Sequence, residues 1–311
     1  MSGHQFRAEA ALRNLRARVA AVVALGGLIA LGLPAVPAPA ASEPAGRVSP
    51  ASAHTVDAGE PAIVRDVSFP QCGGALPRRD NGYAAVLGTN NGIAFSRNPC
   101  LVSQLGWAKR LAGPPAFYAN TGNPGPARAR RWPLGQSSPK VCSGSNPDSL
   151  GCAYDYGWNA AWASYTVAVD AAQRLHRVGR EDARARAANV SWWLDVETMN
   201  SWRTIDDGVS THTRESDVAA IAGEVDALRA IGVESVGIYS TGLQWNQITG
   251  GDRVTGDRFA GIPVWLAGYG SKADAIGGCT DSSFTDGPVQ MTQYLGSDDF
   301  DADVVCGSAS A

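Results

Sequence analysis

Two acidic residues separated by one position stand at the end of a short apolar segment, Asp195 and Glu197 in the run Trp-Trp-Leu-Asp-Val-Glu. On a β-strand such residues point to the same side, about 7 Å apart along the chain. Two carboxyl groups in a partly dry place cannot both ionise easily, so the pKa of one rises and it can donate a proton near neutral pH. Hydrolysis of a glycosidic bond needs one proton donor and one carboxylate. Capping of a loop or binding of a cation is the alternative for such a pair.

Short segments rich in β-branched and aromatic residues alternate with Ala-rich segments of helical period, which is typical of a parallel sheet wrapped by helices. The predicted strands are 62–67, 84–88, 116–120, 190–196, 235–239, 263–267 and 289–294, and the predicted helices are 101–112, 160–178 and 216–231. Seven or eight strands in about 250 residues predict a single-domain α/β protein, a (β/α)8 TIM-like barrel. A doubly wound open sheet is the alternative, but no Gly-x-Gly-x-x-Gly follows the first strand to support it.

Polar residues fall at the ends of nearly all these strands. They are Asp66, Asn90, Asn120, Asp195 with Glu197, Tyr239 and Gln293. In a barrel of this kind the carboxyl ends of the strands form the catalytic face. The pattern therefore predicts one site at the mouth of the barrel, with the acidic pair in it.

Several motifs that follow one another in order carry a family resemblance. The first strand continues as Asp-Val-Ser-Phe-Pro-Gln from Asp66, the fourth ends in Asp-Val-Glu, the fifth and sixth read Gly-Ile-Tyr-Ser and Val-Trp-Leu-Ala, and Gln293-Tyr294 precedes Phe-Asp-Ala-Asp at 300–303. Together they resemble family 25 glycoside hydrolases, the lysozyme-like muramidases, over essentially all of residues 63–303. The chain looks like a diverged, actinobacterial-type branch of that family.

The resemblance implies roles for four carboxylates. Glu197 would be the general acid, and Asp195 would stabilise the developing positive charge or orient the reacting N-acetyl group. Asp66 and Asp301 would complete the ring, with Asp303 or Asp299 as alternatives for Asp301. A buried structural carboxylate is the alternative for Asp66. The implied substrate is peptidoglycan or a related cell-envelope polysaccharide, with no cofactor and no metal, and we expect a monomer.

The second and third strands depart from the family pattern. They end in Gly-Thr-Asn-Asn-Gly (88–92) and Tyr-Ala-Asn-Thr (118–121), and a long insertion over residues 124–155 follows the third strand. Because these strands border the substrate groove, a non-catalytic barrel that binds cell-wall glycan is the competing hypothesis. A third is a metal-dependent phosphodiesterase that uses the carboxylates as Mg²⁺ or Ca²⁺ ligands.

Aromatic faces commonly bind sugar rings, and amides bind their hydroxyl groups. The sequence has 9 tryptophans and 8 tyrosines, which makes such a groove plausible. The candidate substrate-binding residues are Asn90, Asn120, Trp158, Trp202, Tyr239, Trp245, Trp265 and Gln293. Packing in the core is the alternative for each tryptophan, and we expect Trp192 and Trp193 to pack.

The amino-terminal residues predict export. Four arginines precede an apolar run over residues 19–33, which ends at Pro34, and Ala-Pro-Ala at 38–40 fits a signal-peptidase site. We therefore expect a signal peptide over 1–40, a disordered linker rich in Ala, Pro and Ser over 41–60, and the barrel over 61–311. The predicted location is extracellular or cell-wall associated, with no membrane anchor after cleavage.

The cysteines, the charge and the histidines narrow the function further. Six cysteines, an even number in an exported chain, predict three disulfides, and we expect sequential pairing among Cys72, Cys100, Cys142, Cys152, Cys279 and Cys306. Zinc is the alternative for them, but the spacings fit no zinc finger. Residues 1–40 hold four of the 26 basic and one of the 29 acidic residues, so the rest is acidic and nucleic acid is an unsuitable partner. The 4 histidines lie away from the strand ends, which argues against Ser-His-Asp and zinc chemistry.

Overall fold

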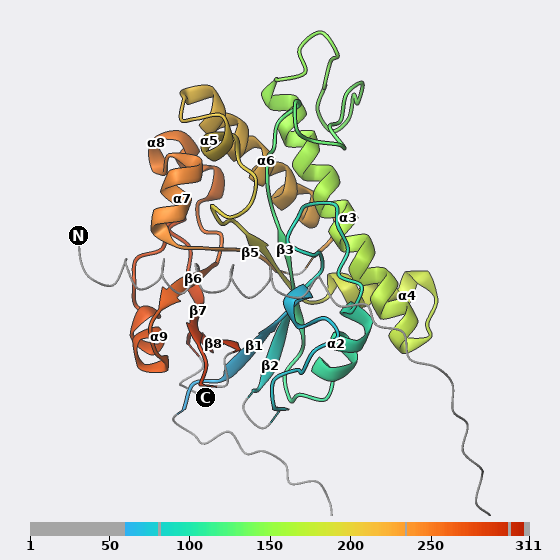
Figure 1. Cartoon of the computed structure of the whole chain (residues 1–311), viewed down its shortest axis with the longest axis vertical. Helices are drawn as coiled ribbons and strands as arrows, with labels where there is room; N and C mark the ends of the chain where they lie inside the picture. Colours follow the sequence, from blue (N-terminus) through green and yellow to red (C-terminus); the bar gives the residue numbers. More distant parts are fainter. Residues whose placement is uncertain (1–59, 80–81, 234, 298–299, 308–311) are drawn as a thin grey trace, which may run out of the picture. The chain divides into compact units, whose positions relative to one another are not determined.

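Eight strands close into a barrel in sequence order (Figure 1). The computed structural model describes residues 60–79, 82–233, 235–297 and 300–307; the expected signal peptide and nearly all of the expected linker lie outside them. The strands are β1 (Ile63–Val67), β2 (Ala84–Gly88), β3 (Ala116–Asn120), β4 (Ser191–Asp195), β5 (Ser235–Ser240), β6 (Val264–Tyr269), β7 (Val289–Leu295) and β8 (Asp301–Val305). The predicted barrel is confirmed, and the pairing of β1 with β8 rules out an open sheet.

The eighth strand departs from the (β/α)8 repeat. Each strand from β1 to β6 is parallel to the next, whereas β8 is antiparallel to both β7 and β1. Leu295 pairs with Asp301, so only residues 296–300 join the two strands. A parallel connection needs about a dozen residues or more. The short link therefore forces a hairpin, and the chain reverses.

Eight α-helices connect or cover the strands. They are α2 (Leu101–Ala108), α3 (Leu150–His176), α4 (Arg180–Ala188), α5 (Arg203–Asp206), α6 (Thr211–Ile231), α7 (Gly242–Thr249), α8 (Asp252–Thr255) and α9 (Lys272–Gly278) within the described residues. In Figure 1, α2, α3 and α4 lie along one side of the strands, and α7, α8 and α9 along the other. Helix α3 starts ten residues before its predicted start, with Ser149 as its N-cap, and α6 starts at Thr211, after Ser210. Helix α6 ends at Gly232, as predicted, with a φ of 89°. Among the described residues, no helix is long and apolar enough to cross a membrane.

Alternating residues of the strands face two separate apolar clusters. Trp192, Leu194 and Val196 belong to the large outer cluster between the strands and the helices. The smaller inner cluster fills the barrel and includes Val64, Val86, Trp193, Tyr239, Trp265 and Met291. The ring of Trp265 lies 4.5 Å from that of Tyr239 and 5.9 Å from that of Trp193, centroid to centroid. The barrel therefore has a packed aromatic floor, on which a site can be built only at the mouth.

Three disulfides pair the cysteines sequentially, as predicted. The bonds are Cys72–Cys100, Cys142–Cys152 and Cys279–Cys306. They close segments of 28, 10 and 27 residues, so the chain-entropy estimate gives roughly 3 kcal/mol of stabilisation for each. The second bond ties the insertion after β3 to the first turn of α3. No free cysteine is found in the described part of the chain.

Candidate active site

Four carboxylates predicted from the sequence converge on the mouth of the barrel. Asp66 lies in β1, Asp195 ends β4, and Glu197 follows it by two residues. The reversal of β8 brings its first residue, Asp301, to the same edge, next to the end of β7. Leu194 and Val196 face the outer cluster, so Asp195 and Glu197 face the mouth, as the alternation predicts.

A fifth carboxylate, Asp303, lies one layer below Asp301. It is fully buried, and the indole N–H of Trp265 donates to its Oδ1 at 2.9 Å. Residues i and i+2 of β8 share a face, so both side chains point into the barrel. Of the alternatives considered for Asp301, Asp303 forms part of the floor, whereas Asp301 stands exposed at the rim. Asp299 lies outside the described residues.

Amide side chains orient two of these carboxylates. Asn120 Nδ2 donates to Oδ2 of Asp195. Gln293 Nε2 donates to Oδ2 of Asp66 at 3.3 Å and in turn accepts from the hydroxyl of Tyr239 at 2.7 Å. Three predicted substrate-binding residues therefore lie at the mouth, where they contact the carboxylates directly or through one another.

Glu197 has its own partner, Gln244, on the first turn of α7. Gln244 Oε1 accepts from the backbone N–H of Thr198 at 2.7 Å and from its hydroxyl at 3.1 Å. This fixes the amide so that its NH₂ group donates to the carboxyl group of Glu197. The backbone oxygen of Glu197 accepts from the indole N–H of Trp202 at 2.7 Å. The residue is held from both sides while its side chain stays only half-buried.

The environment favours the protonated form of the cluster. Burial raises the pKa of Asp66, and the charges of Asp301 and Glu197 raise it further. Burial also raises the pKa of Asp195, again with a contribution from Glu197. The pKa of Glu197 is raised by burial and lowered in part by the hydrogen bond from Gln244. Burial raises the pKa of Asp301, and the charge of Arg65 lowers it. A shared proton is thus retained at higher pH than an isolated carboxyl group would allow.

Five of the predicted groove residues pack against other parts of the protein. Asn90 is buried, and its amide bonds the backbone of Asn120 in both directions, at 3.2 and 3.0 Å. Trp202 and Trp265 are fully buried, the first behind Glu197 and the second in the floor. Trp245 packs between Phe259 and Phe284. Trp158 stacks on Tyr154 and packs against the outer cluster. The rings of Trp158, Trp202 and Trp245 pack in the outer cluster and that of Trp265 packs in the inner cluster, so all four stabilise the barrel.

Two residues near the mouth, Tyr118 and Gln244, were missed by the sequence analysis. Tyr118, two positions before Asn120 on β3, joins the inner cluster, and burial followed by the charge of Asp66 raises its pKa. The alternation of side chains along β3 could have identified Tyr118. The strand-end pattern could not identify Gln244, because it lies on the helix after β5 and not at the end of a strand. The absence of a side chain at Gly88 leaves room for the ring of Tyr118. A Cβ at Gly88 would lie 2.9 Å from Cζ of Tyr118 and 2.6 Å from Cβ of Ser68.

The site shows no metal-binding geometry in the part of the chain that the structure describes. No three His, Cys, Asp or Glu residues there are placed to hold an ion. One oxygen each of Asp66, Asp195 and Asp303 is buried without a hydrogen-bond partner among the described residues. Such an oxygen is less costly when it is protonated, which agrees with the raised pKa of each of these three carboxyl groups.

Comparisons with known proteins give structural likeness only. A muramidase from Acremonium alcalophilum is 16% identical, with a TM-score of 0.48 over 80% of this chain and 95% of that one. A bacterial lysozyme from Streptomyces coelicolor is 18% identical, with a TM-score of 0.44 over 80% and 94%. A family GH25 lysozyme from Aspergillus fumigatus is 16% identical, with a TM-score of 0.44 over 79% and 94%. No protein-family model and no curated protein matches the sequence. The chain is similar to these structures, and its function is argued from the residues of the mouth.

Proposed function

We propose that this protein is a secreted glycoside hydrolase that cleaves glycosidic bonds of peptidoglycan or a related cell-envelope polysaccharide. The observation that carries the proposal is the pairing of a half-buried Glu197 with a buried Asp195 at the mouth, each held by an amide. Glu197 is the acid because it combines a raised pKa with access to solvent, where a glycosidic oxygen can reach it.

The reaction follows from these positions. Glu197 donates its proton to the glycosidic oxygen as the bond from that oxygen to the anomeric carbon breaks. Asp195, oriented by Asn120, stabilises the positive charge that develops on the sugar or orients its N-acetyl group. Water then adds to the anomeric carbon and returns a proton to Glu197. Asp66 and Asp301 keep the field of the mouth negative, which favours both the retained proton and the oxocarbenium-like centre.

Two further observations agree with export. Three disulfides tie down the segments after β1, β3 and α9, and such bonds persist in oxidising compartments. The predicted signal peptide assigns the protein to the extracellular space or the cell wall, as a monomer that needs no cofactor.

The test is release of reducing ends from purified peptidoglycan and from chitin oligomers by the protein lacking residues 1–40, beside Glu197→Gln. Release by the wild type that falls by at least about a hundredfold in the variant supports Glu197 as the acid. Retained release in Glu197→Gln contradicts that assignment. Circular dichroism of both proteins checks that the substitution leaves the fold intact.

A glycan-binding barrel without turnover is the second candidate. It is favoured by the aromatic and basic residues of the insertion after β3, which stand outside the carboxylate cluster. Binding of an envelope glycan by the wild type without release of reducing ends would favour it. Four buried or partly buried acids, Asp66, Asp195, Glu197 and Asp303, argue against it, because a binding surface gains nothing from desolvated carboxylates.

A further inference from the structure

Three aromatic side chains form a wall beside the ends of β2 and β3. Phe95 comes from the loop after β2, Trp132 from the insertion after β3, and Tyr156 from the second turn of α3. The ring of Tyr156 lies 5.1 Å from that of Phe95 and 5.3 Å from that of Trp132, centroid to centroid. Tyr156 is buried, whereas Phe95 and Trp132 are partly exposed. This aromatic wall thus presents apolar ring surface on the face of the barrel that carries the mouth.

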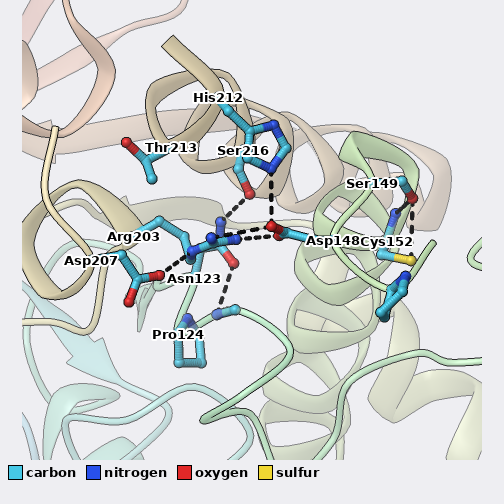
Figure 2. Close-up of polar contacts among 12 residues, drawn as sticks. Asn123, Pro124, Asp148, Ser149, Cys152, Arg203, Asp207, His212, Thr213 and Ser216 are labelled. Atoms are coloured by element: carbon cyan, nitrogen blue, oxygen red, sulfur yellow. Dashed lines mark hydrogen bonds and ion pairs between the residues drawn. The ribbon is translucent and has the colours of Figure 1, made fainter. Parts of the chain in front are cut away.

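The insertion is fixed to the loop that follows the acid. Asp148, at the end of the insertion, pairs with Arg203, only six residues beyond Glu197, and with His212 at 3.2 Å (Figure 2). Arg203 also pairs with Asp207, which pairs in turn with Arg128. The insertion and the acid-bearing loop are therefore anchored as one unit.

The loop that carries Phe95 is tied to the mouth from the other side. It begins at Asn90, whose amide bonds the backbone of Asn120, the residue that donates to Asp195. Phe95 itself holds a φ of 65°, a conformation that is unfavourable for a bulky residue. Packing of its ring in the wall offsets that cost, so the position of the ring is fixed relative to the carboxylates.

A cation for which the described residues provide no carboxylate partner lies on this wall. The guanidinium of Arg131 is 5.7 Å from the centroid of Phe95, and its side chain is exposed. No ion pair of Arg131 is found within the described residues. The neighbouring arginines differ, since Arg97, Arg128 and Arg203 each pair with an aspartate. A ring therefore holds Arg131 in place while its charge stays available to a ligand.

We propose that Arg131 and the aromatic wall form a binding subsite for a carboxylate-bearing sugar of the polysaccharide, beside the cleavage site. The apolar face of the sugar packs on Phe95 and Trp132, as sugars do on aromatic rings. The planar guanidinium of Arg131 pairs with the carboxylate, whose two oxygens match its fork of N–H donors. The subsite rests on the proposed function and adds a preference for acidic over neutral glycan.

The test measures binding without turnover, in the Glu197→Gln background. The probes are peptide-free strands of N-acetylglucosamine and N-acetylmuramic acid, the same strands with their carboxylates converted to amides, and chitin oligomers. Arg131→Gln is expected to weaken binding of the carboxylate strands about tenfold, or 1.4 kcal/mol, and to leave the two neutral probes unchanged. The loss shrinks at high salt because the interaction is ionic.

The control is Arg110→Gln, an exposed arginine beyond the end of α2, where the chain returns towards the start of β3. It removes the same charge far from the wall, and binding of every probe should stay unchanged. Equal affinity of Arg131→Gln and its parent for the carboxylate strands overturns the subsite, and so does an equal loss with all probes. If the subsite is overturned but reducing-end release by the wild type still depends on Glu197, the proposed hydrolase function is retained without the subsite. Absence of binding to any probe overturns both.

Discussion

Helices α3 and α6 approach each other closely at two glycines, so we expect Gly157→Ala to destabilise the protein. A Cβ at Gly157 would lie 1.9 Å from the backbone oxygen of Ala220, and a Cβ at Gly223 would lie 2.0 Å from that of Tyr154. Ordinary contacts begin near 3.4 Å, so an alanine requires the helices to separate by roughly 1.5 Å. Neither obstacle is a side chain that could rotate away.

The magnitude follows from two opposing effects. Overpacking costs about 1–3 kcal/mol, and the upper end applies where backbone meets backbone. Alanine in place of glycine regains up to about 1 kcal/mol of helix propensity. The net loss in the free energy of unfolding is therefore about 2 kcal/mol, which lowers the Tm by roughly 4–8 °C in a domain of this size.

Urea unfolding followed by circular dichroism, with the disulfides intact, measures this loss. Gly277→Ala is the matched control, because this helical glycine of α9 has nothing within 4 Å of an added Cβ. It should be neutral or stabilise the protein by up to about 1 kcal/mol. Equal stability of Gly157→Ala and wild type would refute the argument that the glycines set the distance between the helices.

Two other predictions concern buried carboxyl groups. Gln244→Leu removes the donor that favours ionised Glu197, so the pKa of Glu197 should rise and the alkaline limb of the pH profile of kcat/KM should move to higher pH. Leu243→Ala, an exposed neighbour on the same helix, serves as its control, and an unmoved limb in Gln244→Leu would rule out the contact. Glu224 is buried in α6 with no partner for either oxygen among the described residues, and burial raises its pKa well above 4.5. The folded protein therefore keeps a proton that the unfolded chain loses, and stability falls as pH rises from about 4.5 through the folded pKa. Glu224→Gln should remove up to about 1.4 kcal/mol per pH unit of this pH-dependent loss in the free energy of unfolding. The control Glu215→Gln, at an exposed residue, should leave the pH dependence unchanged. Parallel curves of stability against pH for Glu224→Gln and wild type would contradict the prediction.

The strands and the carboxylates were predictable because both depend on local patterns. Runs of β-branched and aromatic residues marked seven strands, and the i, i+2 spacing placed Asp195 and Glu197 on one face. The start of α3 was missed because Gly151 and Gly157 lower its helix propensity, although Gly157 is needed for the contact with α6. Which tryptophans face solvent was not predictable, since tertiary packing decides it, as for Trp245 between two phenylalanines.

The carboxylate ring depends on the reversal of the last strand. In a complete (β/α)8 repeat the eighth strand would run parallel to β1, and a residue at its start would lie at the edge away from the mouth. The antiparallel pairing of β8 with β7 reverses the direction of β8, so Asp301 lies beside Leu295 at the end of β7, at the mouth. The same reversal places Asp303 beneath it, against Trp265. The departure from the regular barrel is thus what adds the carboxylate of Asp301 to those of Asp66 and Glu197, and its charge contributes to the raised pKa of both.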